Sequence, residues 1–334
     1  MPLDKAPPRC RSVDATHFES HDCKLALRTS DYSLKKEPFV PICIAGMHRS
    51  GTSMIARLLM TVGVDLGPNR TLMPPTPANP EGYWESLPFR ALNDALLSVH
   101  GGTWHTPPEL ADGWEMHEPL AELRRHAASL PTQLGLNEPW AWKDPRNSLT
   151  LPFWSRIWPD VRTIICVRNP LDVANSLITR DQFGLTASLN LWLHYHIRAL
   201  AAVRKKPYMV THFNSYFLDP ATEIRRLMEF LGIRSTENAI HEACTTIAVE
   251  LRHSEVGSDD LERVQAPADV IRMYRTLCSE AGPIFVAAEK VIHPPPALLV
   301  TVLAIALSLE KKVQELDEET RNLRPKIDEQ SRFS

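Results

Sequence analysis

The chain has 334 residues, 43% of them hydrophobic and 23% charged, as expected for a globular protein that buries one large core or two modest ones. Its formal net charge of −3 excludes the broad positive field that draws proteins to nucleic acid. The longest apolar run, residues 297–309, is too short to span a bilayer, so we expect no membrane span.

Residues 1–37 mix charge, proline and polar residues without periodicity, which predicts a weakly structured arm before a domain at 38–290. The arm contains no apolar stretch typical of a secretory signal. The six cysteines have no C-x-x-C spacing and indicate neither a disulfide framework nor a zinc site. We therefore expect a cytoplasmic protein without a metal centre.

Residues 39–63 contain the strongest local signal. A short apolar run leads into Gly-Met-His-Arg-Ser-Gly-Thr-Ser at 46–53, and apolar residues then recur at helical spacing. This pattern predicts a strand, a loop and a helix whose N-terminus can bind an anion, although an ordinary strand-to-helix turn would look similar. The spacing is that of a Walker A motif, but Thr52 stands in place of the lysine. The candidate anion-binding residues are Arg49, Ser50, Gly51, Thr52 and Ser53.

Further along the chain, a proline-rich loop at 67–88 contains Asn-Pro-Glu-Gly-Tyr-Trp-Glu at residues 79–85. The remaining pattern predicts helices at 89–100, 119–130, 171–180, 186–205 and 219–231, a surface loop at 103–118, and strands at 140–144, 161–167 and 208–213.

This alternation predicts an α/β fold of the P-loop-nucleotide-binding type, with a parallel sheet flanked by helices. Ligands of such folds bind at the carboxyl ends of the strands. The glycine-containing loop, Lys143, Arg168 and Phe213 all fall at predicted strand ends, so we expect them to share one site.

The segment 291–334 has a different character, because its apolar residues step by three and four as in a coiled-coil seam. Two interpretations remain open: an amphipathic helix packed on the domain, or a short coiled coil that makes a homo-oligomer. The seam consists of Leu299, Val302, Ala306, Leu309, Val313, Leu316, Thr320 and Leu323.

Arg168 and Ser176 are eight residues apart, across a predicted strand end and the first turns of a helix. A guanidinium fork and a hydroxyl in this arrangement can grip one phosphate. With the lysine-less loop, this pair gives the chain a resemblance to the sulfotransferases that use 3′-phosphoadenylyl sulfate (PAPS). Residues 44–58 resemble the family's 5′-phosphosulfate loop and residues 164–177 its 3′-phosphate motif, within a thinner similarity over 38–255.

The resemblance implies that Arg49, Ser50, Gly51, Thr52 and Ser53 hold the 5′-phosphosulfate of PAPS, and that Arg168 and Ser176 hold the 3′-phosphate. Phe213 falls where an aromatic of the family stacks on adenine, although a core phenylalanine is an equal alternative. Arg252 and His253 resemble a late basic segment that closes over the nucleotide in some members; a solvated loop is the alternative.

For catalysis, the resemblance places Lys143 where cytosolic members have a lysine that neutralises the bridging oxygen of the leaving phosphate. We expect Arg49 to help Lys143 hold the charge that develops on that phosphate. The catalytic histidine of the cytosolic members follows two positions after that lysine, where this chain has Pro145. Other branches of the family use a glutamate base. We therefore expect Glu85 to be the base, with Glu81 in reserve; a solvated loop carboxylate is the alternative.

The predicted function is sulfuryl transfer from PAPS to a hydroxyl or amine, with a saccharide or glycolipid as the expected acceptor. Trp84, Trp104 and Trp114 are candidates for the wall of an acceptor pocket or for core packing. A P-loop kinase is the alternative enzyme, although that class requires a lysine at position 52, where this chain has Thr52. A non-catalytic nucleotide-binding or self-associating protein is the third alternative.

Overall fold

A computed structural model describes residues 39–77, 79–247, 256–257, 259–288 and 297–330. The predicted arm at 1–37 and two candidate residues, Arg252 and His253, lie outside the described residues.

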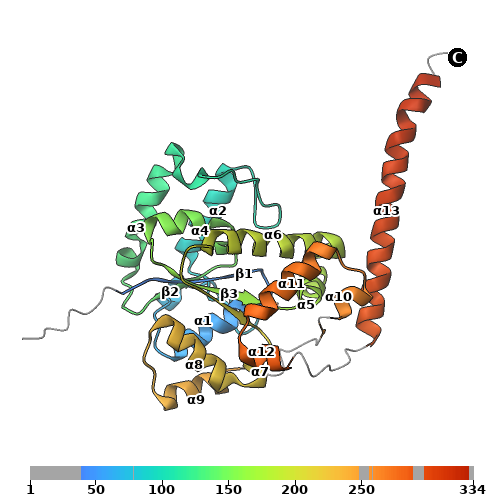
Figure 1. Ribbon diagram of the computed structural model, residues 1–334. Coiled ribbons are helices and arrows are strands. Elements are labelled where there is room, and N and C mark those ends of the chain that lie inside the picture. The colour runs from blue at the N-terminus through green and yellow to red at the C-terminus, as the bar shows by residue number, and fades with distance from the viewer. Residues whose placement is uncertain (1–38, 78, 248–255, 258, 289–296, 331–334) are drawn as a thin grey trace, which may run out of the picture. The chain divides into compact units, whose positions relative to one another are not determined.

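The fold is built on a parallel sheet of four strands, which confirms the predicted α/β class (Figure 1). The strands are β1 (Ile42–Gly46), β2 (Ala141–Lys143), β3 (Arg162–Val167) and β4 (Tyr208–His212), in the order β2-β1-β3-β4. In the parallel register, Ile44 of β1 lies opposite Lys143 on one side and Ile164 on the other. From β1 the chain proceeds first to β2 and then to β3 on the opposite side, so the order reverses between β1 and β3, where parallel sheets bind ligands.

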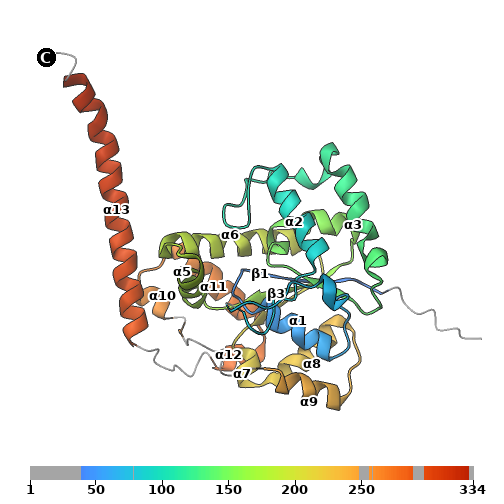
Figure 2. The same cartoon turned by 180° about the vertical axis from the view of Figure 1, so that it is seen from behind.

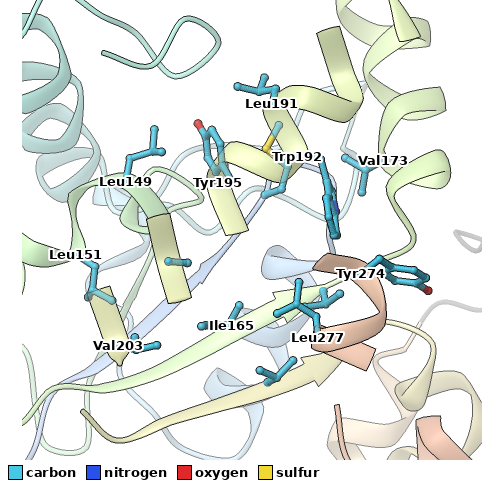
Figure 3. Close-up of a cluster of buried hydrophobic side chains, with 14 of the residues drawn as sticks. Leu149, Leu151, Ile165, Val173, Leu191, Trp192, Tyr195, Val203, Tyr274 and Leu277 are labelled. Atoms are coloured by element: carbon cyan, nitrogen blue, oxygen red, sulfur yellow. The ribbon is translucent and has the colours of Figure 1, made fainter. Parts of the chain in front are cut away.

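Helices cover both faces of the sheet, because alternate strand residues point to opposite sides. Ile44, Ile164 and Met209 belong to one core cluster with residues of α1 (Thr52–Thr61), α8 (Pro220–Leu231) and α9 (Glu237–Thr245). The neighbouring strand residues Ile165 and Val210 belong to a second cluster with residues of α4 (Asn147–Ile157), α6 (Leu185–Val203) and α11 (Ala268–Glu280). Figures 1 and 2 show the two groups of helices on opposite sides of the strands, and Figure 3 shows the second cluster.

The helices predicted from the sequence are present, with small shifts at their ends. They include α2 (Leu87–Val99), α3 (Ala121–Leu134) and α5 (Pro170–Asp181), whereas α4, α9 and α11 were not predicted. Helix α5 begins where Asn169 accepts a hydrogen bond from the N–H of Leu171, and α8 ends at Gly232, whose φ of 66° is left-handed. The remaining short elements are η1 (Asn69–Thr71), η2 (Trp114–Met116), η3 (Glu118–Leu120), α7 (Ser215–Leu218), α10 (Asp260–Arg263) and α12 (Pro283–Ala288).

The C-terminal segment forms one long helix, α13 (Ala297–Gln330), as expected. Leu303 and Leu307 bury its first half in the cluster that contains α6, and the Glu310 carboxylate accepts hydrogen bonds from the N–H groups at the start of α6. Of the predicted seam, Ala306 packs against this cluster, whereas Leu309 and Val313 are exposed. Self-association through this seam stays a prediction. None of the described helices is long and apolar enough to cross a membrane.

Candidate active site

The loop between β1 and α1 adopts a shape that requires glycine at two positions. At Gly46, with φ 139°, an added Cβ would lie 2.5 Å from the carbonyl oxygen of Cys166 on β3. At Gly51, with φ 90°, it would lie 2.5 Å from the Phe213 ring. The Gly46 N–H also donates to Ser148 Oγ on α4 at 2.9 Å. The close approach of β3, α4 and Phe213 thus fixes the path of the loop.

The end of this loop leaves hydrogen-bonding capacity for a ligand. Gly51 occupies the N-cap of α1, and no side chain caps the first turn within the described structure. The hydroxyl of Ser50 is buried and has no hydrogen-bond partner among the described residues. Buried polar atoms are rarely left unpaired, and the exposed N–H groups of a helix N-terminus attract anions. Both features fit an anionic ligand.

The loops after β1 and β3 meet where the strand order reverses. Arg49 Nε donates to Ser176 Oγ at 2.7 Å, and Arg168 Nη1 lies 3.4 Å from the carbonyl oxygen of Arg49. Arg49 has a left-handed φ of 69°, which is uncommon for a residue other than glycine. The structure therefore brings Ser176 and Arg168 to the anion loop, although they lie more than 100 residues later in the chain.

Positive charge is concentrated at this meeting point. The Arg168 guanidinium lies 4.5 Å above the ring of Phe213 and 3.5 Å from Asp172. Burial, followed by repulsion from Arg180 and Arg168, lowers the pKa of Arg49. Crowded cations of this kind are stabilised when an anion binds between them.

Lys143, at the end of β2, forms a buried ion pair with Glu85. Its Nζ lies 2.6 Å from Glu85 Oε1, 2.8 Å from the carbonyl oxygen of Tyr83 and 3.1 Å from Ser53 Oγ. The two side chains are only 2% and 6% exposed. Burial raises the pKa of Glu85, while the charge of Lys143 opposes that rise. Glu85 Oε2 has no hydrogen-bond partner in the described part of the chain.

The loop at 67–88 delivers Glu85 to the site through a strained turn. Trp84 has a left-handed φ of 62°, a rare conformation for a bulky side chain, and its indole N–H donates to the carbonyl oxygen of Glu81 at 2.9 Å. Ser53 Oγ donates to Tyr83 O at 3.1 Å. Glu81 itself lines the same pocket but pairs with Arg57 on α1 and is 39% exposed, so it does not share the burial of the Lys143–Glu85 pair.

A cavity of about 350 Å³ connects these groups, a size typical of small-ligand sites. Its lining includes most of the predicted site: Arg49, Gly51, Thr52, Ser53, Glu85, Lys143, Arg168 and Phe213. Ser50 lies between the lining residues Arg49 and Gly51 in the sequence, and Ser176 accepts a hydrogen bond from Arg49. Trp84 and Trp104 also line the cavity. Trp114 does not, because it is buried beside His100 and borders a different hollow.

The cavity lining also includes residues that were not anticipated, among them His48, Arg146 and Arg180. His48 belongs to the recognised loop, Arg146 lies three residues after Lys143, and Arg180 lies one helical turn after Ser176. Their closeness to predicted site residues was the available signal.

A family model described as the sulfotransferase family matches residues 41–237, more than half of the chain. The chain belongs to the sulfotransferase family. This sulfotransferase is an enzyme of sulfuryl transfer, which argues against the kinase alternative. Among curated proteins, none matches the chain significantly.

Similar solved structures include the sulfotransferase of Alicyclobacillus acidocaldarius, with 16% identity, 73% of this chain and 98% of that chain covered, and a TM-score of 0.41. The sulfotransferase domain of the Synechococcus PCC 7002 olefin synthase has 17% identity, coverage of 81% and 95%, and a TM-score of 0.39. Sulfotransferase STF9 from Mycobacterium avium has 14% identity, coverage of 76% and 77%, and a TM-score of 0.39.

Proposed function

We propose that this sulfotransferase uses PAPS as its donor and transfers the sulfuryl group to a hydroxyl or amine of an acceptor. One observation carries the proposal: the 2.7 Å hydrogen bond from Arg49 to Ser176 joins the two predicted anion sites at a single cavity. A donor with a phosphosulfate at one end and a 3′-phosphate at the other requires two such sites side by side.

The residues present fit this donor. The unpartnered Ser50 hydroxyl and the uncapped start of α1 suit the 5′-phosphosulfate, together with Gly51, Thr52 and Ser53. Arg168 and Ser176 suit the 3′-phosphate, since a guanidinium and a hydroxyl both donate to phosphate oxygens. Phe213 supplies an aromatic surface next to Gly51 for the adenine. Arg252, which lies outside the described residues, remains a proposed contact of the nucleotide.

Lys143 and Arg49 supply the positive charge that stabilises a leaving phosphate. When bound, PAPS supplies a sulfuryl group that the acceptor oxygen or nitrogen takes as the bond to the phosphate oxygen breaks, so that adenosine 3′,5′-bisphosphate (PAP) leaves with the electron pair. Glu85 takes the acceptor's proton on Oε2, the oxygen that has no partner among the described residues.

The ion pair also sets the protonation state of the base. Burial alone would favour the neutral acid form of Glu85, and the charge of Lys143 at 2.6 Å favours the carboxylate. Because the net effect raises the pKa of Glu85, the acid limb of the pH–rate profile should lie at higher pH than an ordinary glutamate would give. A carboxylate with a raised pKa is a stronger base than a glutamate of ordinary pKa.

For the acceptor, we propose a saccharide or a glycolipid. The support is the mixed character of the cavity, where Trp84, Trp104 and Met73 provide apolar surface beside several charged groups.

The test combines donor binding with transfer. Purified enzyme should bind PAP and should transfer label from PAPS to at least one member of a panel of oligosaccharides, glycolipids and simple alcohols. Arg168→Gln should weaken PAP binding at least tenfold, since it removes a charge-assisted contact. Arg225→Gln is the matched control, because Arg225 pairs with Glu237 on the surface away from the cavity. Wild-type affinity for PAP in the Arg168 variant, or binding of ATP–Mg²⁺ in preference to PAP, would refute the proposed donor.

A further inference from the structure

His48, Arg146 and Arg180 line the cavity but have no part in the proposed transfer chemistry. Arg146 follows β2, Arg180 lies near the end of α5, and His48 belongs to the loop after β1. Trp104 joins two of them: the His48 ring lies 4.4 Å from the ring of Trp104, and the Arg180 guanidinium lies 5.7 Å from that same ring.

Arg146 is held rigidly by two carboxylates. Its Nε lies 2.6 Å from Asp94, and its Nη1 lies 3.0 Å from Asp144, while the side chain is only 7% exposed. Asp144 is itself fixed, because Asn93 donates to it at 2.9 Å. Among the described residues, no hydrogen bond involves the second terminal nitrogen, Nη2. A guanidinium held by its other nitrogens loses little freedom when it binds a ligand.

Arg180 has a similar arrangement on the α5 side. Its Nε and Nη2 both lie close to Asp181, at 2.8 and 2.6 Å, and no hydrogen bond involves Nη1 among the described residues. Arg146 and Arg180, two of the arginines that line the cavity, thus each keep a terminal nitrogen for a further acceptor atom.

His48 is the third residue of this part of the cavity, and its pKa is affected by the other two. Burial, followed by the charges of Arg146 and Arg180, lowers the pKa of His48 well below its ordinary value. Its Nε2 is buried and has no partner in the described structure. A neutral imidazole can donate or accept one hydrogen bond to a ligand.

We propose that His48, Arg146 and Arg180 form an acceptor subsite for an anionic oxygen group, so that the substrates of this enzyme are phosphorylated or carboxylated sugars. The inference rests on the proposed function, because it assigns Arg49 and Arg168 to the donor and leaves Arg146, Arg180 and the neutral His48 to the acceptor. Guanidinium forks bind planar carboxylates and phosphates with two parallel hydrogen bonds, which neutral sugars cannot provide.

The test compares three sugars of matched scaffold on the enzyme saturated with PAP. Glucose 6-phosphate, glucuronate and glucose are titrated by calorimetry, so the measurement needs no turnover. We expect at least one of the anionic sugars to bind tenfold or more tightly than glucose. Arg146→Gln and Arg180→Gln should each reduce that preference at least fivefold while the Kd for PAP stays within threefold.

Two further variants keep the test decisive. Arg156→Gln is the control, because this half-exposed arginine pairs with Glu115 outside the cavity and should leave the preference unchanged. His48→Gln supplies a second probe of the subsite if the buried Arg146 variant does not fold. Equal affinity for all three sugars with normal PAP binding would overturn the subsite alone. Loss of PAP binding in both arginine variants would reassign them to the donor site, and failure of the wild type to bind PAP would overturn the proposed function as well.

Discussion

Replacing Glu85 with glutamine separates its role as a base from its role as the partner of Lys143. The amide keeps an oxygen acceptor for Lys143 Nζ, which retains the carbonyl oxygen of Tyr83 at 2.8 Å and Ser53 Oγ at 3.1 Å. Only the charge and the proton-accepting ability of the side chain are lost. The substitution is therefore milder than removal of one partner from a buried ion pair, which costs about 3–5 kcal/mol.

The expected effects differ in size for stability, transfer and donor binding. A hydrogen bond to a charged group contributes about 1.5–3 kcal/mol, so we expect Glu85→Gln to lower the free energy of unfolding by about 2 kcal/mol. For a domain of this size, that loss corresponds to a fall in Tm of about 4–8 °C. General-base catalysis contributes about 10²- to 10⁴-fold, so the transfer rate should fall by that factor. Affinity for PAP should be unchanged or higher, because a negative charge leaves the anion site.

The assay is single-turnover transfer of label from PAPS to the best acceptor of the panel, with thermal unfolding and PAP titration on the same preparations. Glu81→Gln is the matched control, since Glu81 belongs to the same loop but pairs with Arg57. We expect its rate to stay within threefold of wild type. A transfer rate within tenfold of wild type in Glu85→Gln would exclude Glu85 as the base. A tenfold loss of PAP affinity would place this carboxylate in the donor site instead.

Three other changes test the anion loop, the core and the C-terminal helix. Gly51→Ala should weaken PAP binding at least tenfold, because its Cβ would lie 2.5 Å from Phe213; Gly63→Ala, with φ 96° and open space, is the control measured by the same titration. Burial lowers the pKa of His212 to about 3, so the unfolded chain binds the extra proton and stability falls as pH drops from about 6.5 towards 3. Chemical denaturation at several pH values should show that His212→Gln loses about 1.4 kcal/mol less per pH unit than wild type, and an identical slope would contradict this. Glu310→Gln should lower stability by about 1 kcal/mol, since the charge caps the N-terminus of α6; an unchanged Tm would show that α13 does not support that helix.

The sheet and its ligand-binding edge were predictable because their signals are local. Each strand is a short β-branched or apolar run, and the glycine-containing loop after residue 46 follows one of them directly. Parallel strands place their carboxyl ends at one edge, so Lys143, Arg168 and Phe213 were expected to meet there, and all three line the cavity.

Helix α4 was not predictable because its polar residues are satisfied by distant partners. Asn147, Ser148 and Thr150 read as loop residues, yet all three are buried. Asn147 donates to the carbonyl oxygen of Ile44, and Thr150 donates to Asn93 on α2 at 2.7 Å. These partners lie 57 and 103 residues away in the sequence, so no local pattern contains them.

The same limit explains the surfaces that were misjudged or missed. The spacing of apolar residues in α13 suggested a seam through Leu309 and Val313, but the helix docks through Leu303 and Leu307. The position of α6 decides which apolar residues of this helix are buried. Arg146 and Arg180 were missed although each lies within four residues of a predicted site residue, because only the folded chain shows that their side chains face the cavity.

The buried pair of Lys143 and Glu85 is better explained by chemistry than by stability. Removing two charges from water costs several kcal/mol per ion, and an apolar pair of similar volume usually stabilises a fold as well or better. Helix α1 and strand β2 already pack through residues such as Ile55, Leu58 and Ala141, so this edge of the sheet does not depend on an ion pair. The charges lie instead at the wall of the cavity, where Lys143 also reaches Ser53 Oγ of the anion loop at 3.1 Å. A lysine that can stabilise a departing phosphate and a carboxylate that can accept a proton are the two groups that sulfuryl transfer needs, and each compensates the burial of the other until a substrate arrives.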